Sequence, residues 1–141
     1  MSNPYITKQA IYEYLYAVCS KLNPPVDVLQ TYPSVGDNVA YGVYINGVNA
    51  VNRTPYQLGI TPCGSIYTET DEFYLMYVSF QNDPNQGYVT DAITSMIENS
   101  LLWSGYHEVD FSTNISFGAR SKIRYYTINA KRINFNITAN N

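Results

Sequence analysis

The sequence predicts an α+β fold in which two helices pack on a mostly antiparallel sheet of four to six strands. Two neighbouring segments lead to this class. Residues 72–80, EFYLMYVSF, are rich in aromatic and β-branched types and are largely apolar on both alternating faces. A strand with two apolar faces is typical of the middle of a covered sheet. Residues 88–103 repeat apolar side chains at helical spacing and would cover one of those faces.

An amphipathic helix is predicted at the N-terminus, over residues 5–22. Its apolar residues recur at three- and four-residue intervals: Ile11, Tyr14, Leu15, Val18 and Leu22. Asn3 followed by Pro4 is a typical helix start, and Thr7 is the competing cap. The sequence Asn-Pro-Pro at 23–25 would end the helix, because proline disfavours helical geometry in the residue before it.

A short strand, a hairpin and a long loop are predicted next. The strand candidate is 26–32, and residues 39–45 then alternate in polarity as a strand does. Asn46-Gly47 follows directly and is a strong signal for a tight hairpin turn, with 48–51 as the returning arm. Residues 52–65 hold two prolines and two glycines and are predicted to be mostly loop. A loop of this length is often functional or serves assembly.

The C-terminal half is predicted as strand, helix and two further strands. Residues 66–70 are expected to lengthen the central strand, and the polar segment 81–85 to turn the chain. The helix that follows places one apolar stripe on its surface, made by Val89, Ala92, Ile93, Met96, Ile97 and Leu101. Gly105 is its expected stop. Alternating polarity predicts a strand over 107–117, and 121–138 forms either one long strand or two.

Composition limits the classes of function. At 141 residues, the chain is expected to be a single domain, 1–141. Only 13% of the residues are charged, whereas 15 are Tyr and 15 are Asn, a balance that favours surfaces that meet other proteins. The net charge of −3 argues against a general nucleic-acid binder. No secretion signal or membrane span is visible, so the chain is expected to be made in the cytoplasm, with Cys19 and Cys63 reduced.

Residues that could carry chemistry are few. His107 is the only histidine, and nothing around it suggests a nucleophile for it to activate. Glu69, Asp71 and Glu72 place three carboxylates together, which would suit either a divalent cation or a solvated strand entrance. The solvated entrance is preferred, because the spacing matches no metal motif. No phosphate loop, dinucleotide motif or zinc quartet occurs, so the sequence predicts no enzyme activity, no metal and no cofactor.

The basic residues are concentrated near the C-terminus. Five of the eight fall between 120 and 132: Arg120, Lys122, Arg124, Lys131 and Arg132. Arg120, Lys122 and Arg124 share strand parity and would line one face. One interpretation is that their charge protects an edge strand from aggregation. Alternatively, they contact the acidic group Glu69, Asp71 and Glu72 of the next subunit, and head-to-tail contacts of that kind close into rings. DNA passing nearby is a third, weaker use.

The order of elements resembles the tail terminator family of long-tailed phages and related tail-completion and neck proteins. The resemblance covers residues 5–138 and rests on EFYLMYVSF, VTDAITSMIENSLLW and RYYTINAKRINFNI. It implies a virion protein without an active site that forms a homo-oligomeric ring, usually a hexamer. Such a ring caps the tail tube, meets connector and neck proteins, and lets DNA pass through its lumen without sequence-specific binding. The low charge departs from the family pattern, and no site residue carries over.

Two other classes of function remain as alternatives. A ligand-binding module would use exposed tyrosines and Trp103 on a β-rich scaffold to bind carbohydrate or protein. Trp103 is expected instead to cover the apolar stripe of the second helix. An enzyme would have to be a metal-dependent hydrolase built on Glu69, Asp71 and Glu72.

Overall fold

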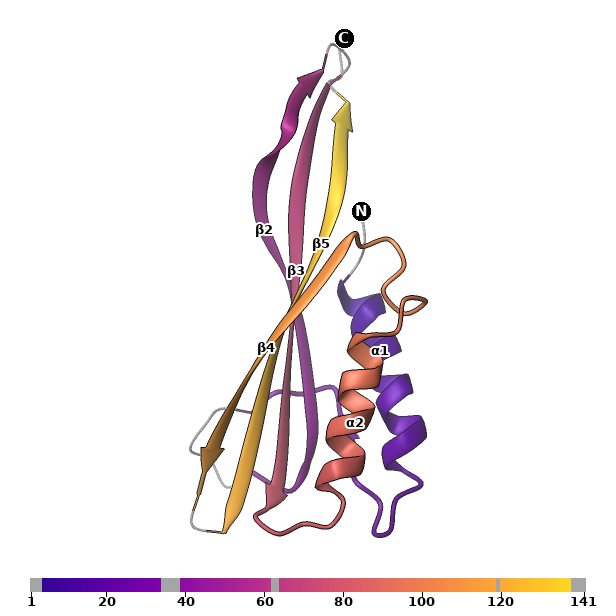
Figure 1. Ribbon diagram of the computed structural model, residues 1–141, viewed down its shortest axis with the longest axis vertical. Coiled ribbons are helices and arrows are strands. Elements are labelled where there is room, and N and C mark those ends of the chain that lie inside the picture. Colours follow the sequence, from indigo (N-terminus) through magenta and orange to yellow (C-terminus); the bar gives the residue numbers. More distant parts are fainter. Residues whose placement is uncertain (1–3, 34–38, 62–63, 119, 138–141) are drawn as a thin grey trace.

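The chain folds as a five-stranded sheet with two helices on one face, in a computed structural model that describes residues 4–33, 39–61, 64–118 and 120–137 (Figure 1). The elements are α1 (Pro4–Cys19), β1 (Val28–Leu29), β2 (Gly42–Thr61), β3 (Gly64–Phe80), α2 (Gln86–Ile97), β4 (Glu108–Phe117) and β5 (Ser121–Ile137). The sheet order is β1-β2-β3-β5-β4, and all neighbours are antiparallel except β1 and β2. The predicted α+β class is confirmed.

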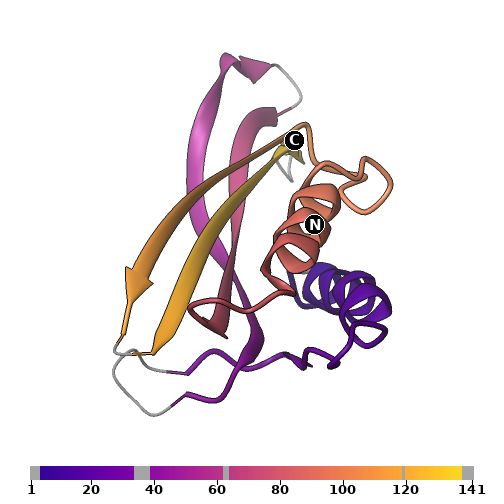
Figure 2. The ribbon, with the colours of Figure 1, turned by 60° about the horizontal axis from the view of Figure 1, so that its bottom comes forward.

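The predicted central strand lies at the centre of the sheet. β3 pairs with β2 on one side and, along its whole length, with β5 on the other. Its residues Phe73, Leu75 and Tyr77 are buried under α1 and α2, which lie on the same face of the sheet (Figure 2). Met76 and Val78 point to the opposite face, where the segment between β1 and β2 covers them. Both faces of this strand are therefore covered, as its two apolar sides require.

The helical core is built from the stripes that the sequence shows. Ile11 and Leu15 of α1 are fully buried, and Val89, Ile93 and Met96 of α2 are fully buried beside them. Their partners on the sheet are the inward-facing residues of β2, β3 and β5. Two residues of the predicted stripes lie outside this core: Val18 of α1 is 37% exposed, and Leu101, which lies beyond the end of α2, is 85% exposed. No described helix is both long and apolar enough to cross a membrane.

The hairpin formed by β2 and β3 is much longer than predicted. Asn46 and Gly47 do not turn the chain but pair with Tyr74 and Phe73 inside the ladder. Residues 52–61 are strand rather than loop, and residues 62–63 lie outside the described residues. The local turn signal fails because β3 offers a continuous pairing partner. The register shifts twice, between Ala50 and Thr54 and between Pro55 and Ile60, and Pro55 and Gly59 lie at the second shift.

Three strands continue beyond the end of β4 and above the helices, and we call this part the distal arm (Figure 1). It consists of residues 51–61, 64–69 and 132–137. β4 does not reach it, because Glu108 at the start of β4 pairs with Lys131. The arm is therefore a three-stranded extension of the body's sheet.

Several element boundaries differ from the prediction. α1 ends at Cys19, and the strand candidate 26–32 shortens to Val28–Leu29. α2 ends at Ile97, well before Gly105. The Asn99 side-chain oxygen accepts the backbone N–H groups of Leu101 and Leu102 at 3.0 and 3.1 Å, which favours a turn over further helix. β4 matches the predicted strand, and β5 is one long strand.

Candidate functional site

A buried ion-pair cluster joins the distal arm to the body. The Arg132 guanidinium lies on β5 opposite Glu69 of β3, and its Nη2 is 2.8 Å from Glu69 Oε2. Its Nη1 forms a second ion pair with Asp71 Oδ2. All three side chains are almost completely buried, with exposed fractions of 5%, 1% and 0%. Arg132 of β5 thus bridges two carboxylates of β3.

Asp71 also accepts hydrogen bonds from two other parts of the chain. The Asn49 side-chain amide of β2 donates to Asp71 Oδ1, and the Tyr106 hydroxyl donates to Asp71 Oδ2 at 2.6 Å. Tyr106 lies in the connection before β4, where it also packs edge-on against Trp103. Asp71 therefore accepts hydrogen bonds from three elements. This arrangement satisfies a buried carboxylate, which burial alone would destabilise.

This geometry changes the expected role of three of the candidate residues. Arg132, Glu69 and Asp71 were predicted on a contact between subunits, but each is buried and bonded within one chain. They have no surface to offer to a neighbour. Their partners could not be identified from the sequence, because they lie more than 60 positions apart and meet only through the register of β3 and β5.

Glu72 differs from the other two carboxylates because it lies on the opposite face of β3. Its Oε1 accepts a hydrogen bond from the Tyr74 hydroxyl at 2.5 Å. That bond, with partial burial, raises the pKa of Tyr74 to about 12. The described residues contain no group of three His, Cys, Asp or Glu side chains placed to hold a metal ion. The interpretation of the three acidic residues as one cation site or one solvated entrance is therefore wrong.

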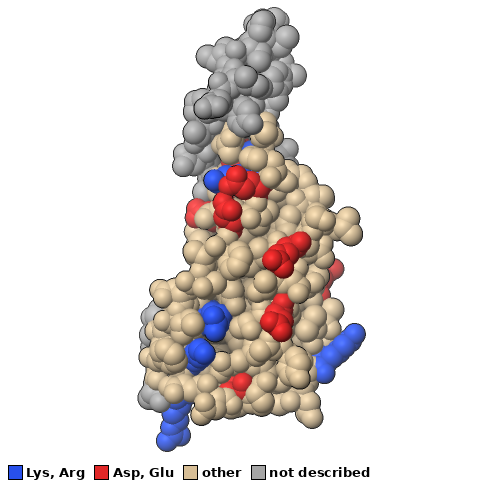
Figure 3. Space-filling view, viewed as in Figure 1, with Lys and Arg blue, Asp and Glu red and all other residues tan. Residues whose placement is uncertain are grey.

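The other basic residues remain near the surface. Lys122 and Arg124 are half-buried and share the helix side of β5, as their parity predicts. Lys122 Nζ donates to Gln86 Oε1 at 3.2 Å and lies 5.9 Å from the centre of the Phe117 ring. Arg120 is exposed just before β5. On the face drawn in Figure 3, basic side chains form a small group left of centre in the lower half, and others project from the lower left and from the right edge.

The interpretation of this basic segment as an edge strand is wrong. β5 is an inner strand that pairs with β3 on one side and β4 on the other. Lys131 forms a surface ion pair with Glu108 at 3.2 Å. The positive charges of Lys122 and Arg124 therefore do not protect a free strand edge in the body. They line the inner side of the sheet next to α2.

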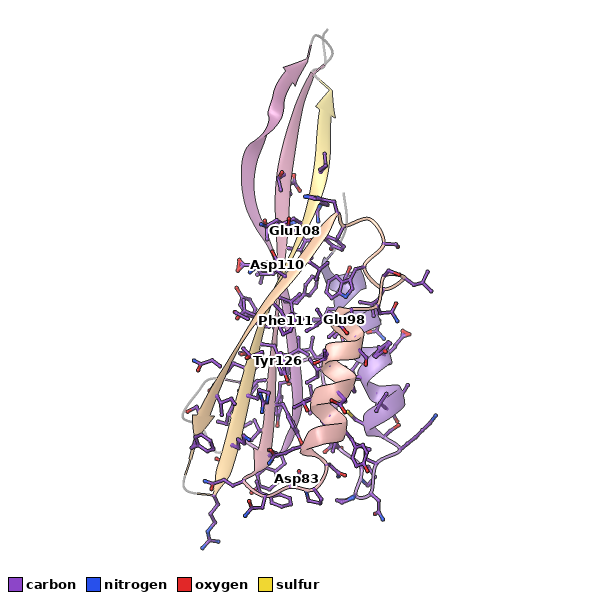
Figure 4. The ribbon with its side chains drawn as sticks, in the orientation of Figure 1. Asp83, Glu98, Glu108, Asp110, Phe111 and Tyr126 are labelled. Atoms are coloured by element: carbon purple, nitrogen blue, oxygen red, sulfur yellow. The ribbon has the colours of Figure 1, made fainter. Side chains whose placement is uncertain are left out.

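The sheet of the body has two edge strands, the short β1 and the longer β4, and the sequence did not reveal β4 as an edge. Glu108 and Asp110 lie at its upper end, and Phe111 lies farther down near Tyr126 of β5 (Figure 4). A hydrogen bond to Glu108 raises the pKa of Asp110 and lowers that of Glu108, so two carboxyl groups are crowded there. Phe111, Ile115 and Phe117 are 42%, 39% and 66% exposed. His107 is exposed beside this end, and its backbone N–H donates to the Lys131 carbonyl.

The remaining candidates are parts of the core. Trp103 is buried, and its indole N–H donates to the Met96 carbonyl at 3.0 Å, so it covers the end of α2 as expected. Cys19 is a free, buried cysteine, and burial raises the pKa of its thiol to about 11. Cys63 lies outside the described residues. Neither Trp103 nor Cys19 is available to a ligand.

Comparison with known proteins adds no assignment. No protein-family model matches the chain, and no curated protein matches it.

Proposed function

We propose that this chain is a structural virion protein: a ring-forming tail terminator or neck component that caps the tail tube and joins it to the head. The observation that carries the proposal is the distal arm. Three strands extend beyond the helices and are fixed at their base by the buried cluster of Arg132, Glu69 and Asp71 (Figure 1). An arm held rigidly to its body suits a protein that reaches over a neighbouring subunit in a ring.

The body provides a second surface for such a contact. Arg120, Lys122 and Arg124 offer positive charge at the end of the body opposite the arm. Head-to-tail contacts between two different surfaces of one chain generate a ring when the rotation closes. The buried cluster does not contribute to this contact, so the acidic partner surface must lie elsewhere than at Glu69 and Asp71.

The experiment is a measurement of assembly with and without one of these charges. Light scattering over a concentration series, followed by negative-stain imaging, should show rings for the wild-type chain. Arg124→Glu should reduce ring formation by about tenfold, because like charges across a contact oppose association. Lys21→Glu makes the same charge change at an exposed residue at the end of α1 and should leave assembly unchanged. Wild-type rings from the Arg124→Glu variant would remove this surface from the contact.

A second candidate is a non-catalytic module that binds carbohydrate or protein through aromatic side chains. Trp103 cannot serve it, because that side chain is buried. The favourable observation is a cavity of about 140 Å³ that Tyr41 and Phe80 line together with Asp27 and Asn85. Tyr41 and Phe80 are 51% and 40% exposed, and their ring centres are 5.8 Å apart. A change in tyrosine fluorescence on glycan titration, lost in Tyr41→Ala, would support this function.

A further inference from the structure

The outer edge of β4 is an open strand edge with an apolar side. Among the described residues, β4 has a neighbour on one side only, which is β5. Its residues are exposed along almost the whole strand. Phe111, Ile115 and Phe117 alternate along it and share the helix side of the sheet. An edge of this kind can accept another strand, because its outward backbone groups have no ladder partner.

The direction of these backbone groups follows from the pairing with β5. The Gly118 N–H donates to the Ser121 carbonyl at 2.9 Å, and antiparallel ladders alternate between bonded and non-bonded pairs. Even-numbered residues of β4 therefore turn their N–H and C=O groups toward β5, and odd-numbered residues turn them outward. The Ile115 N–H fits this alternation, because it donates to the Asn114 side-chain oxygen at 2.9 Å and not to a carbonyl of β5.

We propose that a second copy of this chain pairs antiparallel with β4, around a two-fold axis at Thr113. In a continuous antiparallel sheet, residues that lie opposite one another share a face, so a residue pairs only with one of the same parity. An axis at Thr113 places Phe111 opposite Ile115 of the second copy and Val109 opposite Phe117. The apolar residues on this side of the edge would then meet one another, and aromatic–aliphatic pairs of this kind stabilise a sheet.

Charge also favours the antiparallel arrangement. Glu108 and Asp110 lie at one end of β4, and β4 carries no basic residue. A parallel pair would bring four carboxyl groups together, at a place where the pKa of Asp110 is already raised by Glu108. The antiparallel pair separates the two acidic ends. Each then lies at the end of the partner's sheet that carries the exposed Arg120, so opposite charges come near one another.

This contact is different from the one in the proposed ring and does not rest on it. Two-fold pairing uses the same surface on both copies, whereas a ring contact joins two different surfaces. It would make pairs of chains whether or not the chain is a virion protein. The two proposals can therefore fail separately in the same experiments.

A cysteine scan tests both the pairing and its register. In a Cys63→Ser background, the remaining native thiol is the fully buried Cys19. Thr113→Cys should form a covalent dimer under mild oxidation, because directly opposed residues lie within disulfide reach. Ser112→Cys and Asn114→Cys are the matched controls, since each would face a different residue of the partner. A dominant dimer from either control would overturn the register, and no cross-link at any of the three would overturn the pairing.

Sedimentation equilibrium measures the contact without a cross-link. Thr113→Lys places two like charges across the axis and should raise the dimer dissociation constant by about tenfold. Ser112→Lys adds the same charge one residue away, opposite Asn114 rather than itself, and should change the constant much less. The proposal would be contradicted if both variants changed the constant equally. It would also be contradicted if the wild-type chain stayed monomeric up to near-millimolar concentration. Arg124→Glu should leave the Thr113→Cys cross-link intact even where it abolishes rings.

Discussion

At the scale of single residues, Arg132 has the largest expected effect on stability. Its guanidinium forms ion pairs with two buried carboxylates, Glu69 and Asp71. Replacing a buried ion pair by apolar residues of the same shape costs little stability, but removing one partner of the pair is strongly destabilising. Here the loss of one side chain would break two such pairs.

Arg132→Met should therefore lower the free energy of unfolding by about 3–5 kcal/mol. Urea unfolding followed by circular dichroism would measure it. Adding Glu69→Gln and Asp71→Asn to Arg132→Met should recover part of the loss, because the two side chains are then buried without charge. A stable Arg132→Met protein would mean that the two ion pairs contribute little to folding.

Lys131→Met is the matched control for this experiment. Lys131 is the neighbouring residue and also forms an ion pair, with Glu108, but both side chains are well exposed, at 38% and 45%. Surface ion pairs contribute little, because solvent screens both charges. The unfolding curve of Lys131→Met should stay close to that of the wild type, and a large shift would show that the substitution acts through something other than charge burial.

The sequence identifies these charged residues but not their partners. The clustering of Glu69, Asp71 and Glu72 was visible, yet alternation along β3 sends Glu72 to the other face. Arg132 meets Glu69 only because β3 and β5 pair in one register, and no local pattern encodes that register. The charges of the cluster are therefore visible in the sequence, but the prediction that they lie on a subunit surface is wrong.

At the scale of elements, repeating apolar patterns predicted the helices and the central strand well, whereas single turn and stop signals predicted the element ends poorly. The apolar stripes of α1 and α2 and the two apolar faces of β3 are properties of the residues themselves. Asn46-Gly47 favours a turn only where no neighbouring strand can pair with it. Here β3 pairs with both residues, so the strand continues. The end of α2 depends on the Asn99 side chain and on Trp103, which a search for a stopping glycine does not detect.

The end of α2 gives a prediction at this scale. Trp103 packs edge-on against Phe73, with ring centres 5.4 Å apart, and its indole N–H donates to the Met96 carbonyl at the helix end, which also accepts the Asn99 N–H at 3.2 Å. Trp103→Phe keeps an aromatic ring but removes the indole donor, so the carbonyl keeps only the Asn99 N–H. We expect a loss of about 0.5–1.5 kcal/mol in the free energy of unfolding, the usual net contribution of one hydrogen bond.

Tyr88→Phe serves as the control, because it also removes a polar group from an aromatic residue of α2. Its side chain is 64% exposed, so thermal unfolding should change little. Equal melting temperatures for Trp103→Phe and the wild type would show that the indole hydrogen bond contributes nothing to the helix end.

At the scale of the whole molecule, the described residues form a body with two helices packed on the sheet and an arm made of three strands. The body is held by side chains from α1, α2 and the sheet, whereas the arm is joined to it by three strands and by the buried cluster. Stability and assembly should therefore be separable. We expect the body to determine whether the chain folds and, in the ring that we propose, the arm to determine whether it reaches a neighbour.

Removal of the arm's tip tests this division. Thr54 and Thr68 are paired residues of β2 and β3, so a two-residue Asn-Gly turn can join them in place of residues 55–67. Glu69, Asp71 and Arg132 remain, and the shortened chain should keep a cooperative unfolding transition close to that of the wild type. Light scattering should nevertheless find no rings, because the reaching surface is gone. Rings from the shortened chain would place the subunit contact on the body alone, and an unfolded chain would show that the arm contributes to folding.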